Sequence, residues 1–191
     1  MWLRRLVGRA VAAAMLGLAA GCSSPTAVLD AATSFAEDRS MAQLRDDAAI
    51  KIDLQGQLLA DAYRDLFLEV STNVYEGRVM LTGTVNSLAD KRRATELARA
   101  VEGVKEVYND LQVTKAGGVE AAASDLWIET KLKARLVAEG DVHSINYRWR
   151  SVNGVVYFIG TARSRAELVR VIQVARDTKG VGKVVTHVRL R

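Results

Sequence analysis

Apolar residues recur along this chain at either helical or strand spacing, and the same order of helix-like and strand-like segments occurs twice. A helical stripe comes first, with apolar residues on one face, and two alternating β-prone segments follow it. A second helical segment and a last alternating segment complete each unit. The stripes are Ile50, Leu54 and Leu58 in the first half and Ile128, Leu132 and Leu136 in the second. The pattern predicts an α+β fold with two tandem domains. Each is α-β-β-α-β, with two helices packed on a three-stranded mixed sheet.

Turn and cap residues set the predicted boundaries. We expect strands at 66–75, 79–85 and 105–113, and at 145–152, 155–162 and 183–190, with hairpin turns at Glu76-Gly77 and Asn153-Gly154. Asp47 and the pair Ser124/Asp125 stand where N-caps of the first helices belong. The second helices are predicted to start at capping serines and to end at glycines: Ser87 and Ser164, Gly103 and Gly180.

The two halves also match residue by residue. Segment 77–113 lies over 154–190 with shared residues throughout, among them Gly83/Gly160 and Val107/Val184. One small domain therefore occurs twice, and the differences between the copies indicate where function resides.

The first residues read as an export signal. Arg4, Arg5 and Arg9 precede a short apolar run, which ends in small residues before Cys22. This run is too short to span a membrane, and the cysteine context resembles a bacterial lipobox. We expect lipidation at Cys22, the only cysteine; the alternatives are an ordinary signal peptide with an unused cysteine or an uncleaved anchor. Ser23, which follows, favours outer-membrane sorting by resemblance to enterobacterial lipoproteins.

These signals divide the chain into five parts. They are a signal peptide (1–21), a lipidated N-terminus and tether (22–46), a first domain (47–113), a linker (114–123) and a second domain (124–191).

Two glycine-valine motifs resemble a known family. Segments 103–107 and 180–184 read Gly-Val-x-x-Val, and 77–83 reads Gly-x-Val-x-Leu-x-Gly, as in BON domains. Two such domains behind a lipobox resemble the DolP (formerly YraP) group of outer-membrane lipoproteins. The resemblance implies a lipid-anchored protein on the periplasmic face of the outer membrane that binds phospholipid, supports envelope integrity and is enriched at the division site. It also implies lipid contact through the first helix of the second domain, and it leaves outer-membrane assembly or division-site proteins open as partners.

Charge separates the two copies. The chain carries a formal charge of +5, but 47–113 is acidic, at −3, whereas 125–191 is basic, at +7. A basic domain on a tethered protein indicates an anionic partner, and membrane phospholipid is the nearest one. Nucleic acid is chemically possible, but the export signal and the lack of clustered aromatics argue against it.

A helical wheel of 125–138 concentrates candidate lipid contacts on one side. Ala134 and Ala138 each fall within about 20° of Trp127, away from the apolar stripe, with basic side chains beside them. Tryptophan suits the headgroup level and lysine can snorkel to phosphates. The predicted phospholipid-binding residues are Trp127, Thr130, Lys131, Lys133, Ala134, Arg135 and Ala138.

The first domain lacks this face, because Ala49, Asp53 and Gln57 stand at the positions of Trp127, Lys131 and Arg135. Two alternatives remain open: Trp127 could pack on the linker or the first domain, or it could enter a protein partner. The protein would then be a periplasmic adaptor.

The sequence offers no support for catalysis. It contains no metal-ligand spacing, phosphate-binding glycine loop or nucleophile elbow, so we expect neither a catalytic site nor a metal or cofactor. His143 and His187 are expected at the surface, Trp149 is expected to pack on its strand, and the acids Asp61, Asp65 and Glu69 are expected to form a solvated edge.

Overall fold

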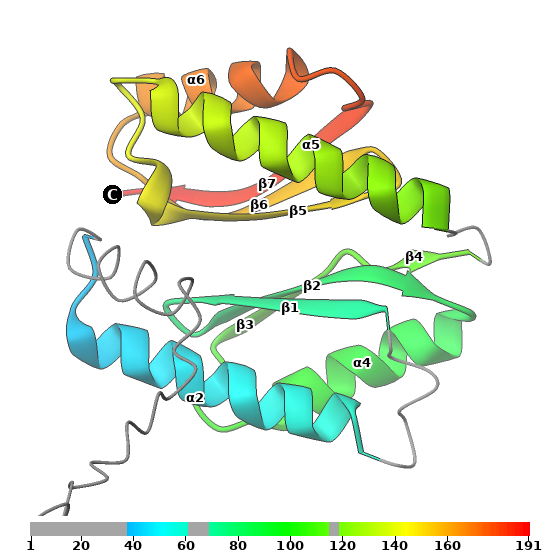
Figure 1. Cartoon of the computed structure of the whole chain (residues 1–191). Helices are drawn as coiled ribbons and strands as arrows, with labels where there is room; N and C mark the ends of the chain where they lie inside the picture. Colours follow the sequence, from blue (N-terminus) through cyan, green and yellow to red (C-terminus); the bar gives the residue numbers. More distant parts are fainter. Residues whose placement is uncertain (1–37, 61–68, 115–118) are drawn as a thin grey trace, which may run out of the picture.

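The computed structural model describes residues 38–60, 69–114 and 119–191, and it contains two units of the predicted order (Figure 1). The first unit comprises α2 (Met41–Leu58), β1 (Val70–Tyr75), β2 (Arg78–Val85), α4 (Leu88–Ala100), β3 (Glu106–Asn109) and β4 (Gln112–Val113). The second comprises α5 (Val119–Ala138), a 3-10 turn (Ser144–Asn146), β5 (Tyr147–Val152), β6 (Val155–Ala162), α6 (Arg165–Arg176) and β7 (Lys183–Leu190). The predicted signal peptide, Cys22, Asp61 and Asp65 lie outside the described residues.

Each domain has one mixed sheet with its two helices on one face. β2 pairs antiparallel with β1 and parallel with β3 and β4, and β6 pairs in the same way with β5 and β7. The predicted stripes form the two cores: Leu54 and Leu132 are both fully buried. The predicted α+β fold is therefore confirmed. It arises because helices whose apolar residues repeat every 3.6 positions pack on strands whose core-facing residues repeat every second position.

The first helices start earlier than predicted. Ser40 caps α2, accepting a hydrogen bond from the backbone N–H of Gln43 at 3.2 Å, while the Gln43 side chain accepts one from the N–H of Ser40 at 2.9 Å. This is a capping box, and it lies in the segment predicted as a tether. In the second domain α5 begins at Val119, so 119–123 of the predicted linker are helical.

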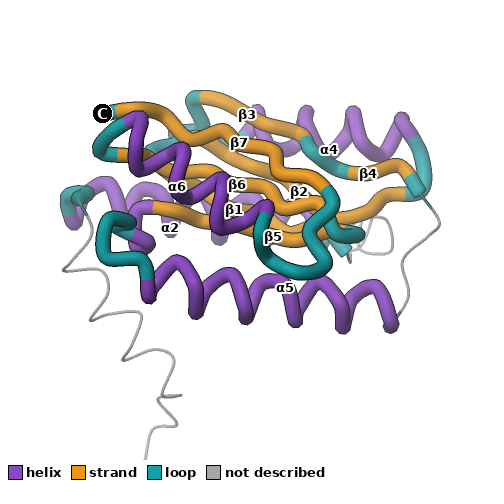
Figure 2. The backbone as a smooth tube through the Cα atoms, turned by 90° about the horizontal axis from the view of Figure 1, so that it is seen from above, coloured by secondary structure: helices purple, strands orange, loops and turns teal. Residues whose placement is uncertain are grey.

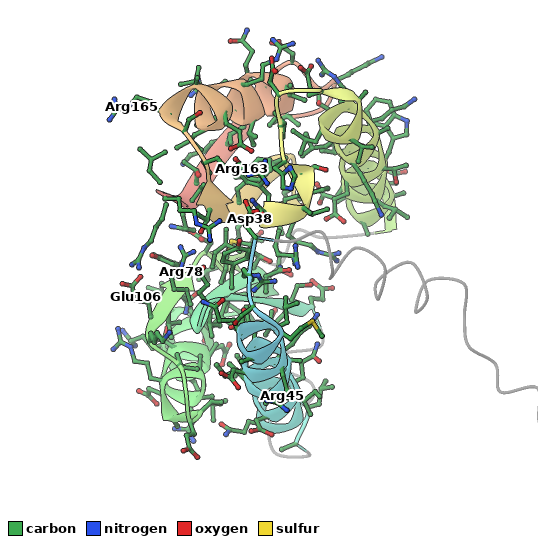
Figure 3. The ribbon with its side chains drawn as sticks, turned by 90° about the vertical axis from the view of Figure 1, so that its left-hand side faces the viewer. Asp38, Arg45, Arg78, Glu106, Arg163 and Arg165 are labelled. Atoms are coloured by element: carbon green, nitrogen blue, oxygen red, sulfur yellow. The ribbon has the colours of Figure 1, made fainter. Side chains whose placement is uncertain are left out.

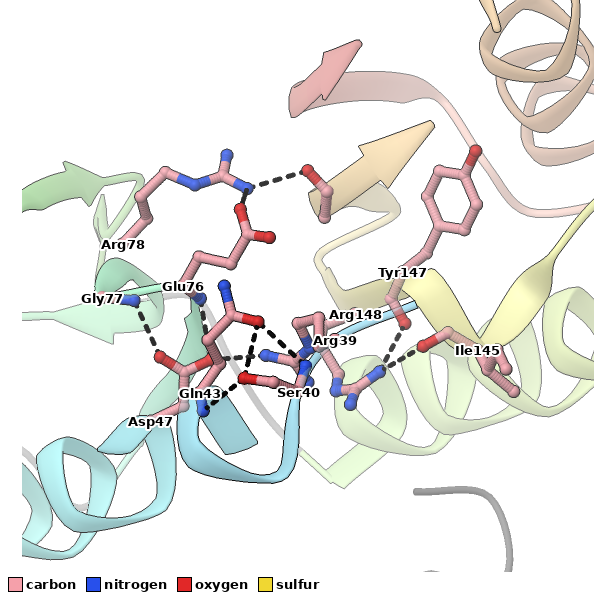
Figure 4. Close-up of polar contacts among 11 residues, drawn as sticks. Arg39, Ser40, Gln43, Asp47, Glu76, Gly77, Arg78, Ile145, Tyr147 and Arg148 are labelled. Atoms are coloured by element: carbon pink, nitrogen blue, oxygen red, sulfur yellow. Dashed lines mark hydrogen bonds and ion pairs between the residues drawn. The ribbon is translucent and has the colours of Figure 1, made fainter. Parts of the chain in front are cut away.

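Asp47 and Asp125 therefore do not cap helices, contrary to prediction. Each lies inside its helix, is almost fully buried, and accepts hydrogen bonds from the hairpin turn of its own domain. Asp47 receives the N–H groups of Glu76 and Gly77, both at 2.7 Å (Figure 4). Asp125 receives those of Asn153 and Gly154 at 2.6 and 2.9 Å. These turn residues have positive φ, between 50° and 77°, as tight hairpins require. A buried carboxylate thus fixes the turn to the helix in both copies.

The second helices begin as predicted. Ser87 accepts the N–H of Asp90, and Ser164 accepts that of Glu167, each at 3.1 Å. The last strand of the first domain differs from the prediction, because it breaks at Asp110 and Leu111 whereas β7 is continuous. Leu111 turns into the core at 1% exposure, and its N–H is held by the Asn109 side chain at 3.1 Å.

The two sheets pack face to face, so the molecule has four layers with helices on both outer sides (Figures 1 and 2). A third apolar cluster fills the space between the sheets: Tyr75, Met80, Val152, Tyr157 and Ile159. Tyr75 and Met80 occupy the same places in the first copy as Val152 and Tyr157 in the second. Equal faces of the two domains therefore meet, as in an isologous dimer formed within one chain.

Polar contacts lock this interface. The Arg78 guanidinium, 1% exposed, donates to the carbonyl oxygens of Gly160 and His187 in the other domain at 2.9 and 3.0 Å. His187 was expected at the surface; instead it stacks on Tyr108 at 4.0 Å, and its Nε2 lies 2.6 Å from the Asp110 carboxylate. That expectation was wrong because the first domain covers this face of β7.

A group of hydrogen bonds made by Asp38, which we call the Asp38 clasp, joins the start of the described chain to the second domain. The Asp38 carboxylate receives two hydrogen bonds from Arg163, at 2.7 and 2.9 Å, and one from Asn146 at 2.8 Å (Figure 3). Arg191 donates to the Asp38 carbonyl oxygen at 3.1 Å. These donors favour the charged carboxylate and hold the pKa of Asp38 well below its usual range.

Asp125→Ala should lower the free energy of unfolding by about 1–3 kcal/mol, because it leaves the turn N–H groups of Asn153 and Gly154 without their acceptor. Urea unfolding measures this loss. Ser124→Ala is the matched control, since Ser124 is exposed, and it should change stability by less than about 0.5 kcal/mol. A larger loss from Ser124→Ala would restore the N-cap prediction.

The Asp38 clasp predicts a specific dependence on pH. Because its pKa is lowered on folding, Asp38 contributes stability above its unfolded pKa of about 4, and this contribution is lost as the pH falls below that value. Asp38→Asn should therefore be less stable than the wild type near neutral pH, and the difference should shrink below about pH 4. Urea titrations of both proteins at several pH values measure it. A difference that is constant with pH would contradict the clasp.

Candidate functional site

The outer side of α5 carries an exposed apolar surface, and the predicted lipid contacts lie on it. Trp127 is 44% exposed, and Thr130, Lys131, Lys133, Ala134 and Ala138 are exposed as well. The stripe Ile128, Leu132 and Leu136 is fully buried on the opposite side. The helical wheel therefore separated the two faces of α5 as the structure does.

Two apolar residues of this surface were missed by the sequence analysis. Leu126 is 64% exposed and Val137 is 65% exposed, both larger fractions than that of Trp127. On the wheel they lie beside Thr130, between Trp127 and Lys133. The signal that could have found them is their angular position, since neither falls on the core stripe. We call Leu126, Trp127, Thr130, Ala134, Val137 and Ala138, with Lys131 and Lys133, the α5 face.

Lysines flank the apolar part of the α5 face on both sides. The Lys131 ammonium lies 5.6 Å from the centre of the Trp127 ring, within the range of a cation–π contact. Lys133 lies on the other side, beyond Leu126 and Val137. The Thr130 hydroxyl donates to the Leu126 carbonyl oxygen at 2.8 Å, so its polar group is satisfied within the helix. An apolar strip between two ammonium groups suits an interface between a polar, anionic layer and an apolar one.

Arg135 has another role. It is only partly exposed, and its guanidinium donates to the Val174 carbonyl oxygen at 3.1 Å and to the Thr178 hydroxyl at 3.0 Å. These contacts tie α5 to the end of α6. The structure therefore separates Arg135 from the other predicted contacts and engages it inside the domain.

Trp127 is not buried between the domains. The third cluster of Tyr75, Met80, Val152, Tyr157 and Ile159 lies between the sheets, on the faces away from α5, and Trp127 does not line the pocket between α5 and the first domain either. This excludes the interdomain form of the adaptor hypothesis. Trp149 packs as predicted, with its ring 6.2 Å from that of Phe158 on the neighbouring strand.

The described residues form neither a metal site nor a membrane-spanning helix. Among their His, Cys, Asp and Glu side chains, no group of three is placed to hold a metal ion. None of the helices within the described ranges is long and apolar enough to cross a bilayer.

Comparison with known proteins agrees with the fold. The BON-domain family model matches residues 46–115 and 124–191. The chain is 40% identical to an uncharacterized protein in the gshII 5′ region of Anaplasma centrale, over 76% of this chain and 95% of that protein. It is 31% identical to the outer membrane lipoprotein DolP of Haemophilus influenzae, over 73% of this chain and 72% of that one. It is also 32% identical to the osmotically-inducible protein Y of Escherichia coli, over 73% and 70% of the two chains.

Arg135→Ala should destabilise the protein by about 1–3 kcal/mol, because it removes two hydrogen bonds between α5 and α6. Lys131→Ala, one turn earlier and exposed, should change the free energy of unfolding by less than about 0.5 kcal/mol. Urea unfolding of the two variants checks the assignment. Equal stability of both variants would return Arg135 to the candidate binding residues.

Proposed function

Since the chain belongs to the BON-domain family and carries two copies of that domain in a DolP-like arrangement, we propose that it is an outer-membrane lipoprotein whose second domain binds anionic phospholipid. Cys22 is the proposed lipidation site, and the α5 face is the proposed lipid contact. The observation that carries the proposal is the exposed apolar strip of α5 between Lys131 and Lys133.

The energetics favour a membrane surface over a soluble ligand. Leu126, Trp127 and Val137 each expose between 44% and 65% of their surface, so sinking them into the headgroup layer removes apolar area from water. Each lysine near an anionic surface contributes about 1 kcal/mol. Such binding is weak in solution, but an acyl anchor at Cys22 would hold the domain close to the membrane and raise its effective concentration there.

The first domain provides an internal comparison. Its helix α2 places Ala49 and Asp53 where α5 has Trp127 and Lys131, and a carboxylate at this position repels anionic lipid. We therefore propose that lipid contact belongs to the second domain and that the first has another task. A role in envelope integrity, including one at the division site, is the process we propose for this activity.

One version of the adaptor hypothesis remains: the α5 face binds in a pocket of another protein. Exposed Trp127 is compatible with it, since tryptophan is enriched at the centres of protein interfaces. Binding to protein-free vesicles distinguishes the two.

The first experiment is flotation of chain 23–191 with vesicles of phosphatidylglycerol or of phosphatidylcholine. This chain lacks the acyl anchor but keeps every residue that the structure describes. We expect flotation with the anionic vesicles alone, and loss of most of it in Trp127→Ala and in Lys131→Glu without change in the circular dichroism spectrum.

Ile52→Ala is the control, because it truncates an apolar side chain on α2 that is 68% exposed. It should float like the wild type. Absence of flotation with either lipid would leave Cys22 as the proposed membrane contact and favour the adaptor. Equal loss from the Ile52 and Trp127 variants would contradict the assignment to the second domain.

A further inference from the structure

Helix α2 and its C-cap residue Leu59 also expose three large apolar side chains, which we call the apolar row. Met41 is 60% exposed, Ile52 68% and Leu59 53%. On a helical wheel these three fall within about 20° of each other, on the side opposite the core residues Ile50, Leu54 and Leu58. At about 1.5 Å per residue they lie about 16 and 10 Å apart along the helix, with exposed Arg45 and Ala48 between Met41 and Ile52, so this side of α2 is partly apolar and partly polar.

A groove on one flank of α2, about 100° or more around the helix from these apolar residues, is lined by acidic side chains. Asp46, Asp53, Glu76 and Glu102 line a groove of about 390 Å³ between α2, the β1–β2 turn and the loop after α4, together with Lys105. Asp46, Asp53 and Glu102 are exposed. We call the apolar row of Met41, Ile52 and Leu59, with these four acids, the α2 face. Arg45, exposed within about 40° of these apolar residues, and Lys105 offset two of the four acidic charges, and the remaining negative charge disfavours an anionic membrane and favours a cationic occupant.

The equivalent positions of the second domain carry the opposite chemistry. Lys131 stands where the first domain has Asp53, and Lys179 stands where it has Glu102. Glu76 and Asp46 correspond to the neutral residues Asn153 and Ser124. Both faces surround the same structural elements, because Gly103 lies against Ile50 as Gly180 lies against Ile128. The two domains thus present the same structural elements, with the charge inverted at two of these positions and absent from the second domain at the other two.

We propose that the α2 face of one molecule binds the α5 face of a second copy of this chain. The exposed apolar residues of the two helices would cover each other, and Asp53 and Glu102 would face Lys131 and Lys179. The complementary cationic, apolar helix is part of the same protein, so no other partner is needed to explain the α2 face. Complementary charges of this kind accelerate encounter and fix the register.

The contact is heterologous, since it joins two different surfaces. Each bound pair keeps one free α2 face and one free α5 face, so association continues into open chains instead of stopping at a dimer. The proposal goes beyond the proposed lipid function but uses the same α5 face. Lipid and a second copy therefore compete for α5, and anionic vesicles should dissociate the chains.

Sedimentation velocity of chain 23–191 over a concentration series tests the contact. We expect concentration-dependent association that weakens with salt, because salt screens exposed charges. Asp53→Lys alone and Lys131→Asp alone should each weaken the dissociation constant at least about tenfold, whereas the two changes together in one chain should restore association. Arg92→Glu, an exposed charge reversal on α4, is the control and should associate like the wild type.

A mixture tests the head-to-tail geometry. Ile52→Arg disables the α2 face and keeps the α5 face, whereas Trp127→Ala does the reverse. Mixed, the two variants should form a one-to-one dimer and nothing larger, while each alone stays monomeric. Failure of the mixture to dimerise, or a wild type that is monomeric at every concentration and salt, would overturn the proposal.

Vesicle flotation separates this result from the lipid function. Asp53→Lys changes the α2 face only, so it should lose self-association and still float with phosphatidylglycerol. If it lost flotation and kept self-association, the roles given to the two faces would be wrong. If the wild type associates but does not float, the lipid function fails and the self-association stands.

Discussion

The packing of one sheet on the other is the contact on which the rest of the molecule depends. Each domain has helices on only one face of its sheet, so the other face would be left in water unless something covered it. The second copy provides this cover, with Tyr75, Met80, Val152, Tyr157 and Ile159 between the sheets. Because the sheets occupy the interior, the α-helices of the described residues, α2, α4, α5 and α6, lie on the outside, and their solvent-facing sides are the surfaces available for contacts (Figure 1).

The interface is symmetric in its apolar part and asymmetric in its polar part. Arg78 of the first domain corresponds to Val155 of the second, and Asp110 corresponds to His187. The equivalent residues Asp110 and His187 contact each other directly, as residues near a two-fold axis do. Arg78 is buried with its charge and donates to two carbonyl oxygens of the other domain, which makes a mismatched pairing of the sheets costly. These polar differences between the copies therefore favour pairing of the first domain with the second over pairing of two identical domains.

The elements that the sequence predicted well are those with local signals. The stripes of period four, the capping serines Ser87 and Ser164 and the turn Asn153-Gly154 are each determined by neighbours in the chain. Asp47 and Asp125 were misassigned because a side chain that binds a distant turn looks, in sequence, like one that caps its own helix. The partial burial of His187 depends on the other domain and has no local signal. One hint was present: β6 reads Val155-Val156-Tyr157-Phe158-Ile159 without a polar residue, which is typical of a strand covered on both faces.

The candidate site was predictable in its location but not in its full composition. The contrast between Trp127 and Ala49 lies in the sequence itself, whereas the engagement of Arg135 with α6 required the packing of two helices. The structure adds a link between the site and the N-terminus. Asp38 is fastened to Arg163 and Asn146 of the second domain, so only residues 23–37 separate Cys22 from the domain that carries the α5 face. At about 3.3–3.6 Å per residue this segment reaches at most about 54 Å. If Cys22 is lipidated, both domains therefore have a short connection to the membrane, the cationic domain through the contacts of Asp38 and the first domain through α2, which begins at Met41.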